Sequence, residues 1–243
     1  MGTNYHSFST GRQSRYRKQT RDQLVVAAAR EFERVGYARA SLAVVCDAAG
    51  LTTGAFYHYF DSKIELAGAI LTAQLPRVQA MADEVASNGS SSVERLLGFL
   101  ASLSALLAND ELVRAAARLA VDRTIGEASE LFAPWAELAT KVIEGGAPPS
   151  SGYTIDVKPL GALATSLVVG AWFGGASSNP ARVASLIRPL STAFVVGVLH
   201  PAEQPAAHEA ADRVFERISR LTADAGDAAR FIGLDSFDGG LEY

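Results

Sequence analysis

Residues 41–63 read SLAVVCDAAGLTTGAFYHYFDSK, and this stretch decides the fold. Its pattern predicts two short helices, Leu42–Ala49 and Thr53–Tyr59, each preceded by a hydroxyl residue that can cap it. Gly50 stands directly after the first helix, where a left-handed backbone costs little only without a Cβ atom. SKIE at 62–65 is a capping box that opens a third helix. Two helices joined by a short glycine turn predict a helix-turn-helix, which places its second helix in the major groove of DNA.

Side chains on the second of these helices fit a DNA-reading role. Thr53 and Tyr57 form an i,i+4 pair, as do Gly54 and His58, so the four lie on one side of the helix. Hydroxyl and imidazole groups can donate to phosphates and base edges, and a glycine lets the backbone approach the duplex closely. Helix-turn-helix geometry also occurs in bundles that never touch DNA. The alternative, that Tyr57 and His58 are ordinary half-exposed surface residues, therefore stays open at this point.

The segment Gly50–Leu66, GLTTGAFYHYFDSKIEL, resembles the signature of TetR-family repressors. Residues 20–42 are similar to the first helix of that family and its exit, so the resemblance covers roughly residues 18–71. It implies an all-α fold with a three-helix DNA-binding head, a larger helical body for ligand binding and dimerisation, and a homodimer. Carried over position by position, it implies DNA contacts from Ser41, Thr52, Thr53, Gly54, Tyr57, His58 and Lys63.

A weaker resemblance extends into the body. LVRAAARLAVDRT (Leu112–Thr124), followed by APWAEL (Ala133–Leu138), is similar to the γ-butyrolactone receptor branch, whose members sense small diffusible signals in antibiotic-producing bacteria. In that branch a tryptophan lines the ligand pocket, and Trp135 matches it. The chain departs from the branch at Thr53, where a lysine is common, so operator contacts and affinity are expected to differ from those of the branch.

Three residues of the body are candidate ligand contacts. The Trp135 ring offers a flat apolar wall and its N–H can orient a carbonyl, although an ordinary core tryptophan is the alternative. Thr165 and Gln74 are lone polar residues in apolar helical contexts, and a buried polar group needs a partner, either a ligand or a backbone carbonyl. Arg118 and Asp122 are spaced for an i,i+4 ion pair, which is a structural role.

Charge is unevenly distributed along the 243 residues. A net charge of −4 speaks against a nucleic-acid binder, but residues 1–67 hold nine Lys and Arg against six Asp and Glu. Between Arg12 and Arg21 there are five basic residues and no acidic one. A basic head and an acidic body would orient the protein on DNA, and this adds Arg15, Arg17 and Lys18 to the expected contacts. The alternative is a solvated tail.

The pattern divides the chain into four segments. These are a disordered basic arm at 1–17, a DNA-binding domain at 18–67, a ligand-binding and dimerisation domain at 68–223 and a flexible acidic tail at 224–243. One helix over 63–86 is expected to join head and body, with a kink at Pro76. Residues 145–158 predict a long flexible loop. The remaining helices are expected at 18–35, 93–108, 111–125, 129–144, 159–175, 180–199 and 206–223.

Two apolar helices near the C-terminus, at about 159–175 and 180–199, predict a dimer interface. They carry few charges and several small residues, which suits a four-helix bundle made by two subunits. Two heads about 34–36 Å apart can read successive major grooves on one face of DNA. The alternative buries both helices within one subunit.

Catalysis, metal binding and cofactors are not expected. The four histidines lack metal-ligand spacing, and the chain has no GxSxG, GxGxxG or P-loop motif. The single cysteine, Cys46, excludes an intrachain disulfide and a cysteine-based zinc site, and the composition suits a reducing cytoplasm. No secretory signal is visible, and the longest apolar run, Leu160–Ala176, is short for a bilayer.

The favoured hypothesis is a homodimeric, ligand-responsive transcriptional repressor without enzymatic activity. It would release a pseudo-palindromic DNA operator when a small hydrophobic signal of γ-butyrolactone, butenolide or furan type binds, and so control antibiotic or other secondary-metabolite genes. Two alternatives remain. One is a receptor-like regulator that senses an antibiotic or no ligand, and the other is a small-molecule binding module with no DNA function.

Overall fold

The computed structural model describes residues 7–122, 126, 128–174 and 180–223. Within these ranges the chain forms α-helices, a short 3₁₀ turn at Pro201–Glu203 and isolated β-bridges, which confirms the all-α prediction. The predicted acidic tail at 224–243 lies outside the described residues. The helices are α1 (Ser7–Val35), α2 (Leu42–Ala48), α3 (Thr53–Phe56), α4 (Lys63–Ala73), α5 (Leu75–Asn88), α6 (Ser92–Asn109), α7 (Glu111–Asp122), α8 (Ala128–Glu144), α9 (Val157–Phe173), α10 (Pro180–Gly197) and α11 (Gln204–Ala223).

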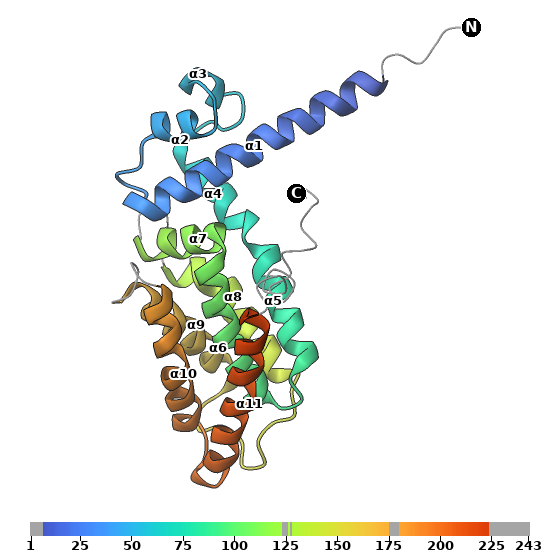
Figure 1. The fold of residues 1–243 in the computed structure, drawn as a ribbon, viewed down its shortest axis with the longest axis vertical. Coiled ribbons are helices and arrows are strands. Elements are labelled where there is room, and N and C mark those ends of the chain that lie inside the picture. The colour runs from blue at the N-terminus through green and yellow to red at the C-terminus, as the bar shows by residue number, and fades with distance from the viewer. Residues whose placement is uncertain (1–6, 123–125, 127, 175–179, 224–243) are drawn as a thin grey trace, which may run out of the picture.

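The head, α1 to α4, forms one end of an elongated molecule, and the other helices extend below it (Figure 1). Its core is aromatic and aliphatic, with Phe32, Phe56, Phe60 and Leu66 all at most 1% exposed. Fully burying a side chain of this kind contributes about 1.5–3 kcal/mol. The helix-turn-helix is therefore held by packing rather than by the propensity of its very short helices.

Helix α6 is the centre of the body. It packs against α5, α8, α9, α10 and α11. Its first turn is capped by Ser91, whose hydroxyl accepts a hydrogen bond from the Glu94 amide at 3.1 Å. A very close helix approach in this region involves Gly161 of α9, where a Cβ atom would lie 2.7 Å from the Ala136 carbonyl oxygen of α8.

Helix α7 belongs to two cores at once. Its residues Leu112, Ala115, Ala116 and Leu119 pack in the core of the head, whereas Val113 and Ala117 pack in the core of the body. Figure 1 shows α7 beneath α1, between the head and the rest of the body. The core of the head thus also includes a helix from far along the chain, beyond the 18–67 segment expected from the sequence.

The prediction of a disordered arm at 1–17 is wrong for residues 7–17, which continue α1 without a break. One contact comes from the end of this extension, and a second comes from one turn further along α1. Arg17 Nη2 donates to the His58 carbonyl oxygen at 3.1 Å, and the Arg21 guanidinium lies 4.6 Å from the centre of the Phe60 ring. The polar composition of residues 1–17 predicted disorder, because local composition carries no information about contacts with residues far along the chain.

The single helix expected over 63–86 is two helices. α4 ends at Ala73 and α5 begins at Leu75, with Gln74 as the shared cap residue. Pro76 lies in the first turn of α5, where its missing N–H costs nothing. The sequence correctly indicated an irregularity at Pro76, but this proline lies at the start of a separate helix instead of kinking one continuous helix.

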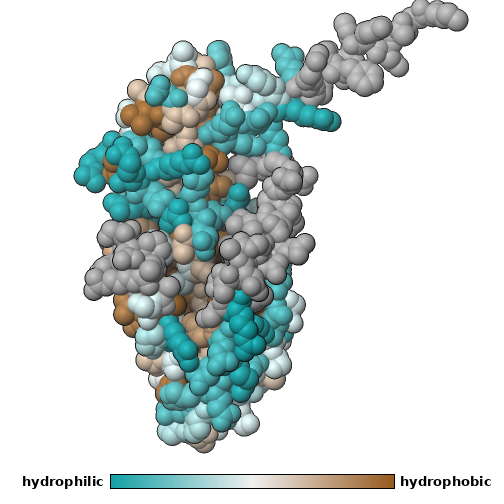
Figure 2. Space-filling model, viewed as in Figure 1, coloured by the Kyte–Doolittle hydropathy of each residue, from teal (hydrophilic) through white to brown (hydrophobic). Residues whose placement is uncertain are grey.

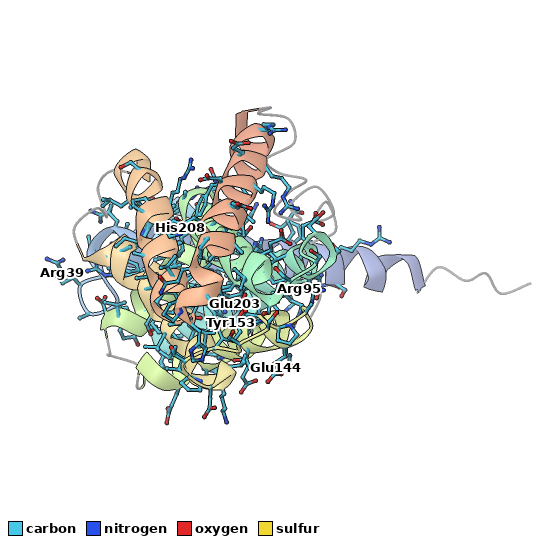
Figure 3. The ribbon with its side chains drawn as sticks, turned by 90° about the horizontal axis from the view of Figure 1, so that it is seen from below. Arg39, Arg95, Glu144, Tyr153, Glu203 and His208 are labelled. Atoms are coloured by element: carbon cyan, nitrogen blue, oxygen red, sulfur yellow. The ribbon has the colours of Figure 1, made fainter. Side chains whose placement is uncertain are left out.

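The connection between α8 and α9, predicted to be a long flexible loop, is fastened at the end of the body. The Ser92 amide donates to the Ala147 carbonyl at 2.9 Å, and the Ser92 and Tyr153 hydroxyls are 2.7 Å apart. The Ser151 amide donates to Glu203 at 3.0 Å, and Figure 3 labels Tyr153 and Glu203 at this end of the body, seen from below.

No single helix among the described residues is long and apolar enough to cross a membrane. Helices α6 and α7 meet the length and composition criteria only as a pair, and they are bent by 101° at their junction.

Candidate nucleic-acid interface and body site

The α2–α3 unit is held tightly against the head. Gly50 adopts φ +69°, and the Leu51 amide donates to the Cys46 carbonyl at 2.8 Å, which closes the turn between the two helices. Cys46 is a free, buried cysteine, and burial raises the pKa of its thiol. Helix α3 is shorter than predicted, because the chain tightens into a turn after Phe56.

The side chains predicted to read DNA lie on the exposed surface of this unit. Tyr57 is 56% exposed. The Thr52 hydroxyl accepts a hydrogen bond from the Ala55 amide at 3.2 Å and so caps α3, whereas the Ser41 hydroxyl caps nothing. The structure brings the following predicted contacts together on α2, α3 and the residues beside them, all exposed: Ser41, Thr52, Thr53, Gly54, Tyr57 and His58.

Lys63 is placed differently from these residues. It is only half-exposed, its ammonium group donates to the Ala40 carbonyl at 2.7 Å, and it lies 4.6 Å from the centre of the Tyr37 ring. Burial lowers its pKa. The ammonium group is thus engaged inside the head, and this favours a structural role.

A basic hollow flanks the unit. It has a volume of about 650 Å³ and lies between α1 and the end of α2. Its charged lining residues are three basic ones and one acidic one: Arg15, Lys18, Arg30 and Asp22. Figure 2 shows hydrophilic surface along the described part of the α1 projection. This surface can attract the phosphate backbone beside the recognition helix.

Two of the three candidate ligand contacts meet in the body. The Trp135 indole N–H donates to Gln74 Oε1 at 2.9 Å, and these residues are 1% and 3% exposed. The bond joins α8 to the break between α4 and α5. Thr165 is buried on α9 and donates to the Gly161 carbonyl at 3.1 Å within its own helix. Trp172 packs in the body core.

A largely buried ion pair joins α5 to the start of α7. Arg77 of α5 lies 2.7 Å from Asp110, whose carboxylate also accepts the amide hydrogen bonds of Leu112 and Val113 at 2.8 and 3.1 Å and so caps α7. Asp110 stands directly before α7 in the sequence, but its partner Arg77, 33 positions away, leaves no local signal. The Arg118–Asp122 pair, at 2.9 Å, confirms the i,i+4 prediction.

Among the residues that the structure describes, no group of three or more His, Cys, Asp or Glu side chains could hold a metal ion. The arrangement on the head can bind an extended polyanion through hydroxyls, cations and backbone amides. The arrangement in the body can offer one indole donor and one amide to a small molecule.

The comparisons with known proteins agree with this geometry. Residues 24–70 match the family described as bacterial regulatory proteins, tetR family. The chain is 39% identical over 74 residues to the HTH-type transcriptional regulator TtgR of Pseudomonas putida. It is 44% identical over 54 residues to the probable HTH-type transcriptional regulator ArpR, also of Pseudomonas putida. These matches cover 28% and 22% of this chain, and only 35% and 26% of the two relatives.

Solved structures match over most of the chain. A γ-butyrolactone receptor (ArpA-like protein) is 26% identical with a TM-score of 0.63, over 83% of this chain and 98% of its own. The TetR-family protein CprB from Streptomyces coelicolor, solved in complex with its biological operator sequence, has the same identity, TM-score and coverage.

Proposed function

Because this chain belongs to the TetR family of bacterial regulatory proteins, we propose that it is a homodimeric transcriptional repressor whose two heads bind a pseudo-palindromic operator in the cytoplasm. The observation that carries the proposal is the exposed polar face of the α2–α3 unit beside a basic hollow. Proposed DNA contacts come from Arg15, Lys18, Ser41, Thr52, Thr53, Gly54, Tyr57 and His58. Arg17 is proposed instead to hold the segment after α3 in place through the His58 carbonyl. Lys63 is proposed to hold the α1–α2 connection in place through the Ala40 carbonyl.

A second copy of the chain is proposed to cover α9 and α10. Exposed leucines lie on these helices, with Leu163 at 47%, Leu186 at 41% and Leu190 at 37%. Exposed apolar residues that gather on adjacent helices are typical of an interface. A dimer made there would carry two heads, which a two-fold operator requires.

The ligand is proposed to be a small, mostly apolar signal of γ-butyrolactone, butenolide or furan type that binds beside Trp135, Gln74 and Thr165. In support, the Trp135 N–H and the Gln74 amide form a polar pair inside an apolar core. A ligand carbonyl can replace Gln74 as the acceptor for the indole N–H, and the displaced amide would then need a new partner on the ligand or the protein. The solved γ-butyrolactone receptors among its structural relatives support this ligand class.

Release of the operator requires that the ligand bind the released conformation more tightly than the DNA-bound one. A differential affinity of about 3 kcal/mol would weaken operator binding roughly 150-fold. Genes of antibiotic or other secondary-metabolite production are the proposed targets.

The test of the repressor proposal is a mobility shift on the DNA upstream of the protein's own gene, with and without an organic extract of the producing culture. We expect a shift that the extract abolishes, and an affinity that falls steeply with salt because phosphate neutralisation releases counterions. Tyr57→Phe should weaken binding to all sequences alike if the hydroxyl contacts a phosphate. Absence of a shift at low salt would favour a binding module without DNA function.

The body site is tested in the same assay with Trp135→Phe. This variant keeps an apolar ring but has no N–H, so we expect operator binding to persist while the extract loses potency. Trp172→Phe, in the same core, is the matched control and should leave the response to the extract intact. Equal responses from the two variants would contradict the assignment of Trp135.

A further inference from the structure

Helix α7 meets α1 through a ladder of opposite charges. Arg30 of α1 binds both carboxylate oxygens of Glu111 of α7, at 2.7 and 3.2 Å. One turn further along both helices, Glu33 of α1 pairs with Arg114 of α7 at 2.7 Å. Both pairs are separated by 81 positions in the sequence, so the two helices run in the same direction along the ladder.

The order of the charges fixes the register of the two helices. Along α1 the order is Arg30 then Glu33, and along α7 it is Glu111 then Arg114. If α7 slid by one turn in one direction, Arg114 would face Arg30, and in the other direction Glu111 would face Glu33. Like charges meet in either case, so each step of sliding loses two attractions and gains a repulsion.

The far end of α7 is fastened at the exit of α1. The Tyr37 amide donates to Asp122 Oδ2 at 3.3 Å, and Arg118 pairs with the other oxygen of that carboxylate at 2.9 Å. The Tyr37 ring in turn covers the Lys63 ammonium group, which holds the Ala40 carbonyl just before α2. Charged contacts therefore run without a gap from the body helix to the start of the DNA-binding unit.

The near end of α7 is fastened to the body. Arg114 also donates to the Leu107 and Ala108 carbonyls at the end of α6, at 3.2 and 2.9 Å, and Asp110 joins the start of α7 to Arg77 of α5. Arg77 lies one turn beyond Gln74, the partner of Trp135. A movement at α5 or α6 thus reaches α7 directly.

We propose that the α1–α7 ladder is a register lock that sets the position of the head on the body, and that the state of the body reaches the DNA-binding helices through α7 and α1. This route runs beside α4, which also packs against α7 and ends at Gln74, where α5 begins. Arg30, Glu33, Glu111 and Arg114 are positioning residues for operator binding. The part of this inference that concerns operator affinity rests on the proposed DNA function, whereas the part that concerns how the head is held on the body does not.

The test reverses one rung of the ladder and then restores it. Arg30→Glu places two carboxylates opposite each other, and Arg30→Glu with Glu111→Arg re-forms the pair with the charges exchanged. Both readouts use the full chain. They are the affinity for the duplex upstream of its own gene, and hydrogen exchange of the backbone amides at the α1–α2 connection, which include Tyr37.

Arg30→Glu is expected to weaken duplex binding at least about fivefold and to speed exchange at the α1–α2 connection. The double variant is expected to return both readouts to within about twofold of the unaltered protein. Arg30→Lys keeps the charge but loses the bidentate geometry, so both of its readouts are expected to lie between those of the unaltered protein and of Arg30→Glu. The thermal midpoint serves as a control, since a surface pair contributes little to global stability.

Three results overturn the proposal. They are no change in exchange for Arg30→Glu, a double variant as fast in exchange as the single one, or exchange restored while duplex binding stays weak, which would mean that Arg30 itself touches DNA. If the unaltered protein binds no duplex, the proposed function fails, and the exchange measurements still decide whether the ladder holds the head.

Discussion

Gly36 occupies a very tight point between head and body. Its φ is +79°, a conformation that other residues adopt only with strain, and a Cβ atom there would lie 2.7 Å from the Asp122 carboxylate. The glycine thus serves two purposes at once, because it both ends α1 and leaves room for the carboxylate that binds the Tyr37 amide. The sequence indicated the first purpose through the end of the helix pattern, and the second only appears once α7 is in place.

Gly36→Ala is therefore expected to lower the free energy of unfolding by about 2–4 kcal/mol. This loss has two causes, the strain of the left-handed backbone and the displacement of the Asp122 side chain. Gly50→Ala is the matched control, because its φ is +69° but nothing lies within 4 Å of the added carbon. It should cost only about 1–2 kcal/mol. Urea unfolding of both variants measures the difference, and equal losses would mean that the Asp122 contact carries no cost.

At the scale of the element, caps and periodicity in the sequence predicted where most helices begin and end, but they did not predict which helices pack against one another. Ser62 caps α4 as predicted, because its hydroxyl accepts a hydrogen bond from the Glu65 amide at 3.2 Å. The second bond of the predicted capping box differs, since the Glu65 carboxylate accepts from the Asp61 amide at 2.6 Å instead of from the Ser62 amide. The extension of α1 to Ser7 was missed, and its contact with the His58 carbonyl lies 41 positions along the chain. The division at Gln74 was expected only as a kink at Pro76, and the bond from Trp135 to Gln74 gave no local signal. The charge ladder was missed for the same reason.

The packing of α8 on α9 gives a second prediction. Gly161→Ala would place a methyl group 2.7 Å from the Ala136 carbonyl and force the helices apart, so the free energy of unfolding should fall by about 1–3 kcal/mol. Gly68→Ala, within α4 and with nothing within 4 Å, should instead raise it by about 0.5–1 kcal/mol through helix propensity. Thermal unfolding of the two variants checks both signs, and a stable Gly161→Ala protein would show that the two helices can separate without cost.

At the scale of the whole molecule, the proposed assembly depends on one apolar face. Leu163→Asp and Leu190→Asp each place a charge among the exposed leucines of α9 and α10. We expect sedimentation to shift from dimer to monomer, because burying an unpaired carboxylate is costly. Operator affinity should then fall by a factor on the order of 100 or more, since the second head no longer binds at high effective concentration.

Val121→Ser is the control for these variants. Val121 is 40% exposed but lies on α7, which is not one of the two helices of the proposed interface, so the variant should sediment as the unaltered protein does. Leu163→Asp or Leu190→Asp variants that remain dimeric would place the interface elsewhere on the molecule.

The double membership of α7 bears on how such regulators can be recombined. Four of its apolar residues complete the core of a head whose other helices lie more than 35 positions earlier in the chain. A chimera that takes residues only up to the end of α4 from a relative would lack that relative's own α7 residues in the core of the head. Its α1 charges would also face the α7 charges of a different protein. Exchange of operator specificity between relatives, in the laboratory or in evolution, should therefore succeed when α7 travels with the head or when the four ladder positions already agree.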